Sequence, residues 1–129
     1  MRILGLVWAL AIAACFTEPN QASLWGSDQA SLSVTAQGAT LQILASGDCY
    51  GSYGEITQPI GFGSFTLPGR YTQLMGVAPG YVRYPAEFSG SIVRGLMTLS
   101  VSIPTLQQNL GPFHLTLGEG RTWPPCLYP

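Results

Sequence analysis

The sequence predicts an all-β protein: a small antiparallel β-barrel or β-sandwich of about seven to eight short strands that follows an N-terminal signal peptide. Two observations lead to this prediction. From Ser31 onward, apolar residues alternate with polar residues, which is the period of a half-buried strand. Turn residues, mainly glycine and proline, separate the alternating segments, and none of these segments has the period of an amphipathic helix.

The first predicted hairpin begins at Ser31. Its two strands alternate serine, threonine and glutamine with apolar residues, and Gln37-Gly38 supplies the turn between them. The apolar positions of the hairpin are Leu32, Val34, Leu41, Ile43 and Ala45. Ser46-Gly47-Asp48 then breaks the pattern, so we expect Cys49 to open the next segment.

A second turn is predicted at Pro68-Gly69. Proline fits the first central position of a type II turn, and glycine supplies the positive φ at the second. Phe65 and Leu67 lead into this turn, and the segment from Arg70 to Met75 can return as the partner strand. The sequence therefore predicts a hairpin centred on Pro68-Gly69.

The clearest strand runs from Met97 to Ile103. Its even alternation places one face in the core, namely Met97, Leu99, Val101 and Ile103. Phe88, Gly90 and Ile92 precede it across an Arg94-Gly95 turn, which predicts another hairpin. Pro104 ends the strand, because proline cannot donate a hydrogen bond to a ladder.

The last predicted strand follows a polar loop at residues 105–111. Phe113, Leu115 and Leu117 alternate with polar residues, which places His114 on the opposite face. The segment 118–120, Gly-Glu-Gly, then turns the chain toward Cys126.

The N-terminus has the pattern of an export signal. Arg2 precedes an uninterrupted apolar run from Ile3 to Ala14, and small residues stand directly before Cys15. The sequence Ile12-Ala13-Ala14-Cys15 resembles the lipobox of bacterial lipoproteins. This resemblance implies cleavage after Ala14, acylation of the Cys15 thiol and a lipid-anchored location in the bacterial cell envelope. The alternatives are a plain signal peptide that leaves a secreted or periplasmic protein, and a retained anchor, for which the apolar run is short.

Three regions are therefore expected: a signal peptide at residues 1–14, a lipidated N-terminus and flexible tether at 15–30, and the β-domain at 31–129. The segment 16–30 is polar and aperiodic, as a tether would be. Trp25 is the exception, and we expect its large apolar ring to dock on the domain or at the membrane interface.

The cysteines support the prediction of export. If Cys15 carries lipid, Cys49 and Cys126 remain as a pair in an oxidising compartment, and a disulfide is the natural inference. It would close a loop of about 78 residues and contribute roughly 4 kcal/mol in the chain-entropy model. Two unpaired thiols are the alternative. No metal or other cofactor is expected, because no CxxC, HxxxH or carboxylate cluster supplies neighbouring ligands.

Charged residues make up only 9% of the chain, and lysine is absent. After cleavage the chain would contain six acidic residues and only four arginines, namely Arg70, Arg83, Arg94 and Arg121. The sequence therefore does not predict a nucleic-acid-binding protein, because such a protein needs clustered cations to neutralise the phosphates. The high apolar content and small net charge also argue against disorder.

Tyrosines supply the candidate binding surface. Two of them stand in one glycine-rich segment and two in another: Tyr50, Tyr53, Tyr81 and Tyr84. A tyrosine ring beside glycine can present a stacking platform to a sugar or a partner protein. The alternative is that these rings seal the ends of the barrel. The glycines at 51–54 and 61–63 are expected to form bulges or tight turns, since no helix follows them to complete a phosphate loop.

Catalytic groups are sparse, so the sequence predicts a protein that is not an enzyme. The alternative is an envelope hydrolase or sugar-acting enzyme that uses Glu55, Glu87 or His114. Two glutamates can act as a glycosidase pair when their separation is suitable. His114 is the only histidine, and its strand position predicts an exposed side chain. There is no G-x-S-x-G nucleophile elbow.

In its predicted location, its size and the cysteine pair that links an early strand to the C-terminus, the chain resembles the membrane-bound inhibitors of c-type lysozyme. Those inhibitors carry Ser-Gly, then tyrosine, then Lys-Gly; this chain matches the first two residues with Ser89-Gly90. The resemblance implies lysozyme inhibition as a further alternative. The favoured expectation is a non-enzymatic envelope lipoprotein, held to the membrane by its N-terminal lipid, whose β-domain binds or supports an envelope protein or a glycan.

Overall fold

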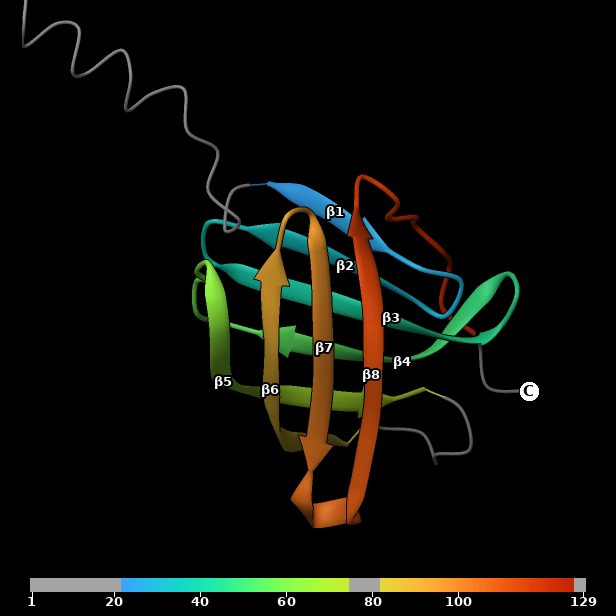
Figure 1. The fold of residues 1–129 in the computed structure, drawn as a ribbon. Coiled ribbons are helices and arrows are strands. Elements are labelled where there is room, and N and C mark those ends of the chain that lie inside the picture. Colours follow the sequence, from blue (N-terminus) through green and yellow to red (C-terminus); the bar gives the residue numbers. More distant parts are fainter. Residues whose placement is uncertain (1–21, 75–81, 127–129) are drawn as a thin grey trace, which may run out of the picture.

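The computed structural model describes residues 22–74 and 82–126. Eight antiparallel strands form a closed barrel in which each strand pairs with the next along the chain (Figure 1). The strands are β1 (Ser23–Gly26), β2 (Ala30–Thr35), β3 (Gly38–Ser46), β4 (Cys49–Ile56), β5 (Gly63–Gln73), β6 (Arg83–Val93), β7 (Leu96–Ile103) and β8 (Gln108–Leu117). The prediction of a small antiparallel barrel is confirmed.

Pairing between β1 and β8 closes the barrel, with Trp25 opposite Leu117 and Gly26 opposite Thr116. The prediction of a flexible tether was therefore wrong for residues 23–26. Four residues are too few to display an alternating pattern, yet the Trp25 ring is only 2% exposed and lies in the core. The expectation that Trp25 docks on the domain is confirmed. Cys15 and the predicted signal peptide lie outside the described residues.

The predicted hairpins 31–45 and 88–103 are confirmed as β2–β3 and β6–β7. The core faces of both hairpins are buried as the alternation predicts, and Leu99 and Val101 are almost fully covered. Arg94 and Gly95 both have positive φ, which matches the twist of a two-residue hairpin turn. At the end of β3 a register shift after Ile43 leaves Ala45 exposed, although the alternation placed it inside.

The predicted turn at Pro68-Gly69 was wrong. Both residues lie within β5, a continuous strand that bends between its two halves (Figure 1). The pairing of β5 with β4 ends at Ile56 opposite Gly69, so Pro68 has a strand neighbour only in β6. Because β4 does not pair with Pro68, the absence of an N–H group on proline removes no hydrogen bond between β4 and β5.

Two inward-facing glycines make room for Phe88 of β6. A Cβ atom built on Gly54 would lie 2.6 Å from Phe88 Cζ, and one on Gly69 would lie 2.6 Å from Phe88 Cε1. The prediction of a bulge or turn at 51–54 is confirmed in part: these residues lie within β4, but the pairing with β3 skips Gly51, because Ile43 pairs with Ser52 and Leu44 with Tyr50. Gly61 and Phe62 do lie in the connection between β4 and β5, and Gly63, at positive φ, begins β5.

The polar loop predicted at residues 105–111 is mostly strand. A single 3-10 turn, η1 (Pro104–Leu106), and Gln107 in the left-handed region reverse the chain, and β8 begins at Gln108. Pro104 ends β7 as predicted, because it starts this turn.

Among the described residues, no helix has the length and hydropathy needed to span a bilayer.

The C-terminal segment 121–126 crosses the outside of β2, β3 and β4. Arg121 N–H donates to Ser31 Oγ (2.9 Å), and Trp123 N–H donates to Gln42 Oε1 (3.2 Å). The Cys49–Cys126 disulfide is present, and beside it Cys126 N–H donates to Tyr50 O (2.8 Å). The segment forms a strap on the outer wall of the barrel, and Trp123 is half-buried outside the core cluster.

Thr72 provides a stability test of the outer wall. Its side chain is fully buried, and its Oγ1 has no hydrogen-bond partner in the described part of the chain. An unsatisfied buried hydroxyl costs about 1–3 kcal/mol, so Thr72→Val should raise the free energy of unfolding by about 1 kcal/mol. Urea denaturation measures the change. Thr66→Val, at an exposed position of the same strand, is the control and should be near neutral; equal effects of the two would contradict this account of Thr72.

Candidate functional site

Polar and aromatic side chains gather on the outer face of β4, β5 and β6. The strand register arranges them in rows across the three strands. The first row is Tyr53, Thr72 and Arg83; the second is Glu55, Arg70 and Pro85. We call the surface formed by Tyr50, Tyr53, Glu55, Arg70 and Arg83 the tyrosine–arginine face.

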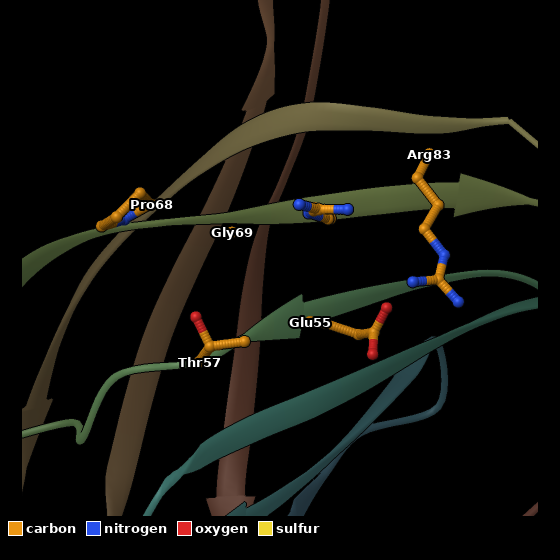
Figure 2. Close-up of a pocket in the computed structure, with 6 residues that line it drawn as sticks. Glu55, Thr57, Pro68, Gly69 and Arg83 are labelled. Atoms are coloured by element: carbon orange, nitrogen blue, oxygen red, sulfur yellow. The ribbon is translucent and has the colours of Figure 1, made fainter.

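A groove of about 360 Å³ lies in this face, lined by Glu55, Thr57, Pro68, Gly69, Arg70 and Arg83. Figure 2 shows the Glu55 carboxylate and the Arg83 guanidinium directed toward one another from β4 and β6. The lining contains two guanidinium groups and one carboxylate, so its charge is positive. Guanidinium groups suit ligands that carry carboxylate or phosphate, which they bind in a bidentate manner.

The aromatic part of the face adjoins the groove. Tyr50 and Tyr53 form an edge-to-face pair with ring centroids 6.2 Å apart, and both are half-buried. Tyr53 stands in the same row as Arg83, with Thr72 between them. The pair is thus held by its own packing, and its rings offer apolar surface beside the guanidinium groups.

The structure divides the four predicted tyrosines. It brings Tyr50 and Tyr53 together on β4, whereas Tyr84 faces the interior and packs against the core opposite Tyr71. Tyr81 lies outside the described residues. Tyr84 therefore does not belong to the outer surface on which Tyr50 and Tyr53 lie.

The residues of the enzyme alternative do not share one groove. Glu55 lines the groove of the tyrosine–arginine face, and Glu87 is exposed on β6, opposite Pro68. His114 is exposed on β8, as predicted, and lines a separate groove of about 330 Å³ with Asp28, Glu119 and Arg121. In the part of the chain that the structure describes, no three histidine, cysteine or acidic side chains are grouped to hold a metal ion.

Sequence reasoning missed Arg70 and Arg83 as members of the site. The predicted hairpin at Pro68-Gly69 paired the strand of Arg70 with the segment of Phe65 and Leu67, whereas Arg70 pairs with Glu55 and Pro85. Nothing local indicated that Arg83 faces Thr72. Only the pairing of β4 with β5 and of β5 with β6 aligns the two arginines with Glu55. One sequence pattern could have predicted that β5 is a continuous strand. The alternation continues through Pro68-Gly69 and places on the inner face Phe65, Leu67, Gly69 and Tyr71.

Ser89-Gly90, the residues shared with lysozyme inhibitors, lie within β6. Ser89 pairs with Thr66 and Ser100 of the neighbouring strands. Gly90 is inward-facing, and a Cβ atom there would meet the backbone of Thr98.

Comparison with protein-family models, curated proteins and solved structures finds no match to this chain.

Proposed function

We propose that this protein is a non-enzymatic lipoprotein of the bacterial envelope that binds an acidic glycan through its tyrosine–arginine face. The observation that carries the proposal is the alignment of the Tyr50–Tyr53 pair with Arg70 and Arg83 on one outer face of the barrel. The barrel serves as the scaffold that positions these side chains.

The chemistry of the face fits such a ligand. Sugar rings have an apolar face that stacks on aromatic rings, and tyrosine combines that surface with a hydroxyl for hydrogen bonding. Arginine adds recognition of carboxylate groups, which acidic glycans carry along their length. Glu55, in the same groove as the two arginines, can accept hydrogen bonds from sugar hydroxyls. An extended polymer suits a shallow groove, because it can make contacts all along the face.

The location is proposed from the N-terminal sequence. The lipobox pattern at Ile12–Cys15 supports lipidation of Cys15, and two or three acyl chains hold a protein at a membrane far more firmly than one. The Cys49–Cys126 disulfide is consistent with export, since such bonds persist in oxidising compartments.

Replacing the lipidated cysteine tests the anchor. Cys15→Ala should shift the protein from the membrane fraction to the soluble fraction, because the acyl chains can no longer be attached. Cell fractionation with immunoblotting measures the shift, and mass spectrometry of the mature N-terminus detects the lipid directly. Ser33→Ala, at an exposed position of β2 outside the lipobox, should remain with the membrane. Unchanged membrane partition of Cys15→Ala would refute the lipid anchor.

Purified cell-wall glycan tests the binding face. The protein should co-sediment with sacculi, and Tyr53→Ala and Arg83→Ala should each weaken binding about tenfold or more, as expected for losing an interaction of about 1.4 kcal/mol. Arg94→Ala is the matched control: it removes the same charge from an exposed turn at the far end of β6 from Arg83, and it should bind like the parent protein.

Two results of that experiment would contradict the proposal. One is the absence of co-sedimentation by the folded parent protein. The other is an equal loss of binding in Arg83→Ala and Arg94→Ala, which would indicate a response to net charge without a defined site. Circular dichroism and urea denaturation establish that each variant is folded as the parent is.

A further inference from the structure

One end of the barrel carries exposed apolar side chains. Val93 and Leu96 form a cross-strand pair beside the β6–β7 turn and are 59% and 60% exposed. Leu117 at the end of β8 is 48% exposed, and its N–H donates to Gly95 O (2.9 Å). These three exposed side chains lie at the same end of the barrel, and we call them the apolar tip.

The chain enters the barrel at the same end. Ser23 begins β1 only two residues before Trp25, which pairs with Leu117 of the tip. Two residues of strand span about 7 Å. Figure 1 shows the β6–β7 turn, the end of β8 and β1 together at one end of the barrel, whereas η1 lies at the opposite end.

We propose that the apolar tip docks into the surface of the bilayer that holds the lipid on Cys15. This inference rests on the lipid anchor of the proposed function. Cys15 stands seven positions before Ala22, the first described residue, and seven extended residues reach at most about 25 Å. The tip is therefore within reach of the membrane.

The chemistry of the tip suits a membrane–water interface. Val93 and Leu96 flank Arg94, which is exposed at the turn. Apolar side chains bury themselves at the boundary of headgroups and acyl chains, and a neighbouring cation is attracted to anionic lipid headgroups. Leu24, 41% exposed on the adjoining β1, flanks the tip on the side where the chain enters.

Site-directed fluorescence in vesicles tests the docking. The full-length, membrane-extracted protein with Leu96→Cys is labelled with an NBD fluorophore and reconstituted in vesicles of three parts phosphatidylethanolamine to one part phosphatidylglycerol. We expect the label emission to shift to shorter wavelength by about 10 nm or more and to be quenched by doxyl-labelled lipid. The same label at Thr105→Cys, an exposed position in η1, should emit as in water.

A second variant separates docking from the properties of the label. Val93→Ser together with Leu117→Ser, in the labelled Leu96→Cys protein, should abolish most of the shift and the quenching. Both replaced side chains are exposed, so the barrel should remain folded. Persistence of the full shift in this background would overturn the proposal.

The remaining outcomes distinguish this inference from the anchor. If the protein floats with the vesicles but the label at position 96 emits as in water, the anchor holds and the docking is refuted. If the protein does not float, the anchor fails, and the docking proposal fails with it. A blue shift without vesicles would also refute docking, because it would indicate that the tip contacts a second copy of the chain.

Discussion

Removing the Cys49–Cys126 disulfide should lower the free energy of unfolding by about 4 kcal/mol. The bond joins residues 77 positions apart, and in the chain-entropy model a cross-link of that span greatly restricts the unfolded chain. The Cys49→Ala/Cys126→Ala protein should therefore unfold at a much lower urea concentration. A loss below about 1 kcal/mol would contradict this role of the bond.

Reduction of the parent protein is the matched control. A thiol reductant should lower the stability of the parent to that of the double alanine variant and leave the variant unchanged. Hydrogen exchange should show the C-terminal strap loosening first, because Pro124 and Pro125 donate no amide hydrogen bonds and the strap relies on a few contacts, such as Cys126 N–H to Tyr50 O. Opening of β6 and β7 before the strap would contradict that order.

Phe88→Ala should cost about 3–5 kcal/mol. The Phe88 side chain is fully buried, and its ring fills the space above Gly54 and Gly69. Neither glycine has a side chain that can move into the cavity, so the cost should be toward the upper end of that range. Phe62→Ala is the matched control, because that ring is 66% exposed and its removal should change stability by about 0.5 kcal/mol or less.

A double-mutant cycle tests the fit between ring and glycine. Gly54→Ala should destabilise the parent by about 1–3 kcal/mol, because the new methyl group overlaps the Phe88 ring. In a Phe88→Leu background the same change should cost less, since the smaller side chain leaves room. Strict additivity of the two substitutions would show that the ring and the glycine are not in contact.

Long uninterrupted alternation made parts of this fold predictable. Met97 to Ile103 has four inward positions in regular succession, and all four are buried. The Pro68-Gly69 prediction failed for a tertiary reason: a Cβ atom at position 69 would meet the Glu55 backbone oxygen of β4 and the Phe88 ring of β6, so glycine is required there. Proline is tolerated because the β4 pairing stops beside it. Local turn preference gave no information about either neighbour.

The site was only partly predictable for the same reason. Tyr50 and Tyr53 stand close in sequence on one strand, so their proximity could be anticipated. Arg83 reaches the same face only through the order and register of β4, β5 and β6, which the sequence of each strand does not encode by itself. β1 was missed because its single deeply buried large side chain, Trp25, forms no recurring pattern.

Photocrosslinking in intact bacteria tests most directly whether the tyrosine–arginine face binds envelope glycan. Tyr53 is replaced by benzoylphenylalanine, which keeps an aromatic ring at that position, and His114, exposed in the other groove, receives the same replacement as the control. The account predicts adducts from position 53 that a glycan-cleaving muramidase reduces to small, discrete mass additions, and no such adducts from position 114. Adducts from position 53 that resist muramidase, or glycan adducts in equal amounts from both positions, would contradict it.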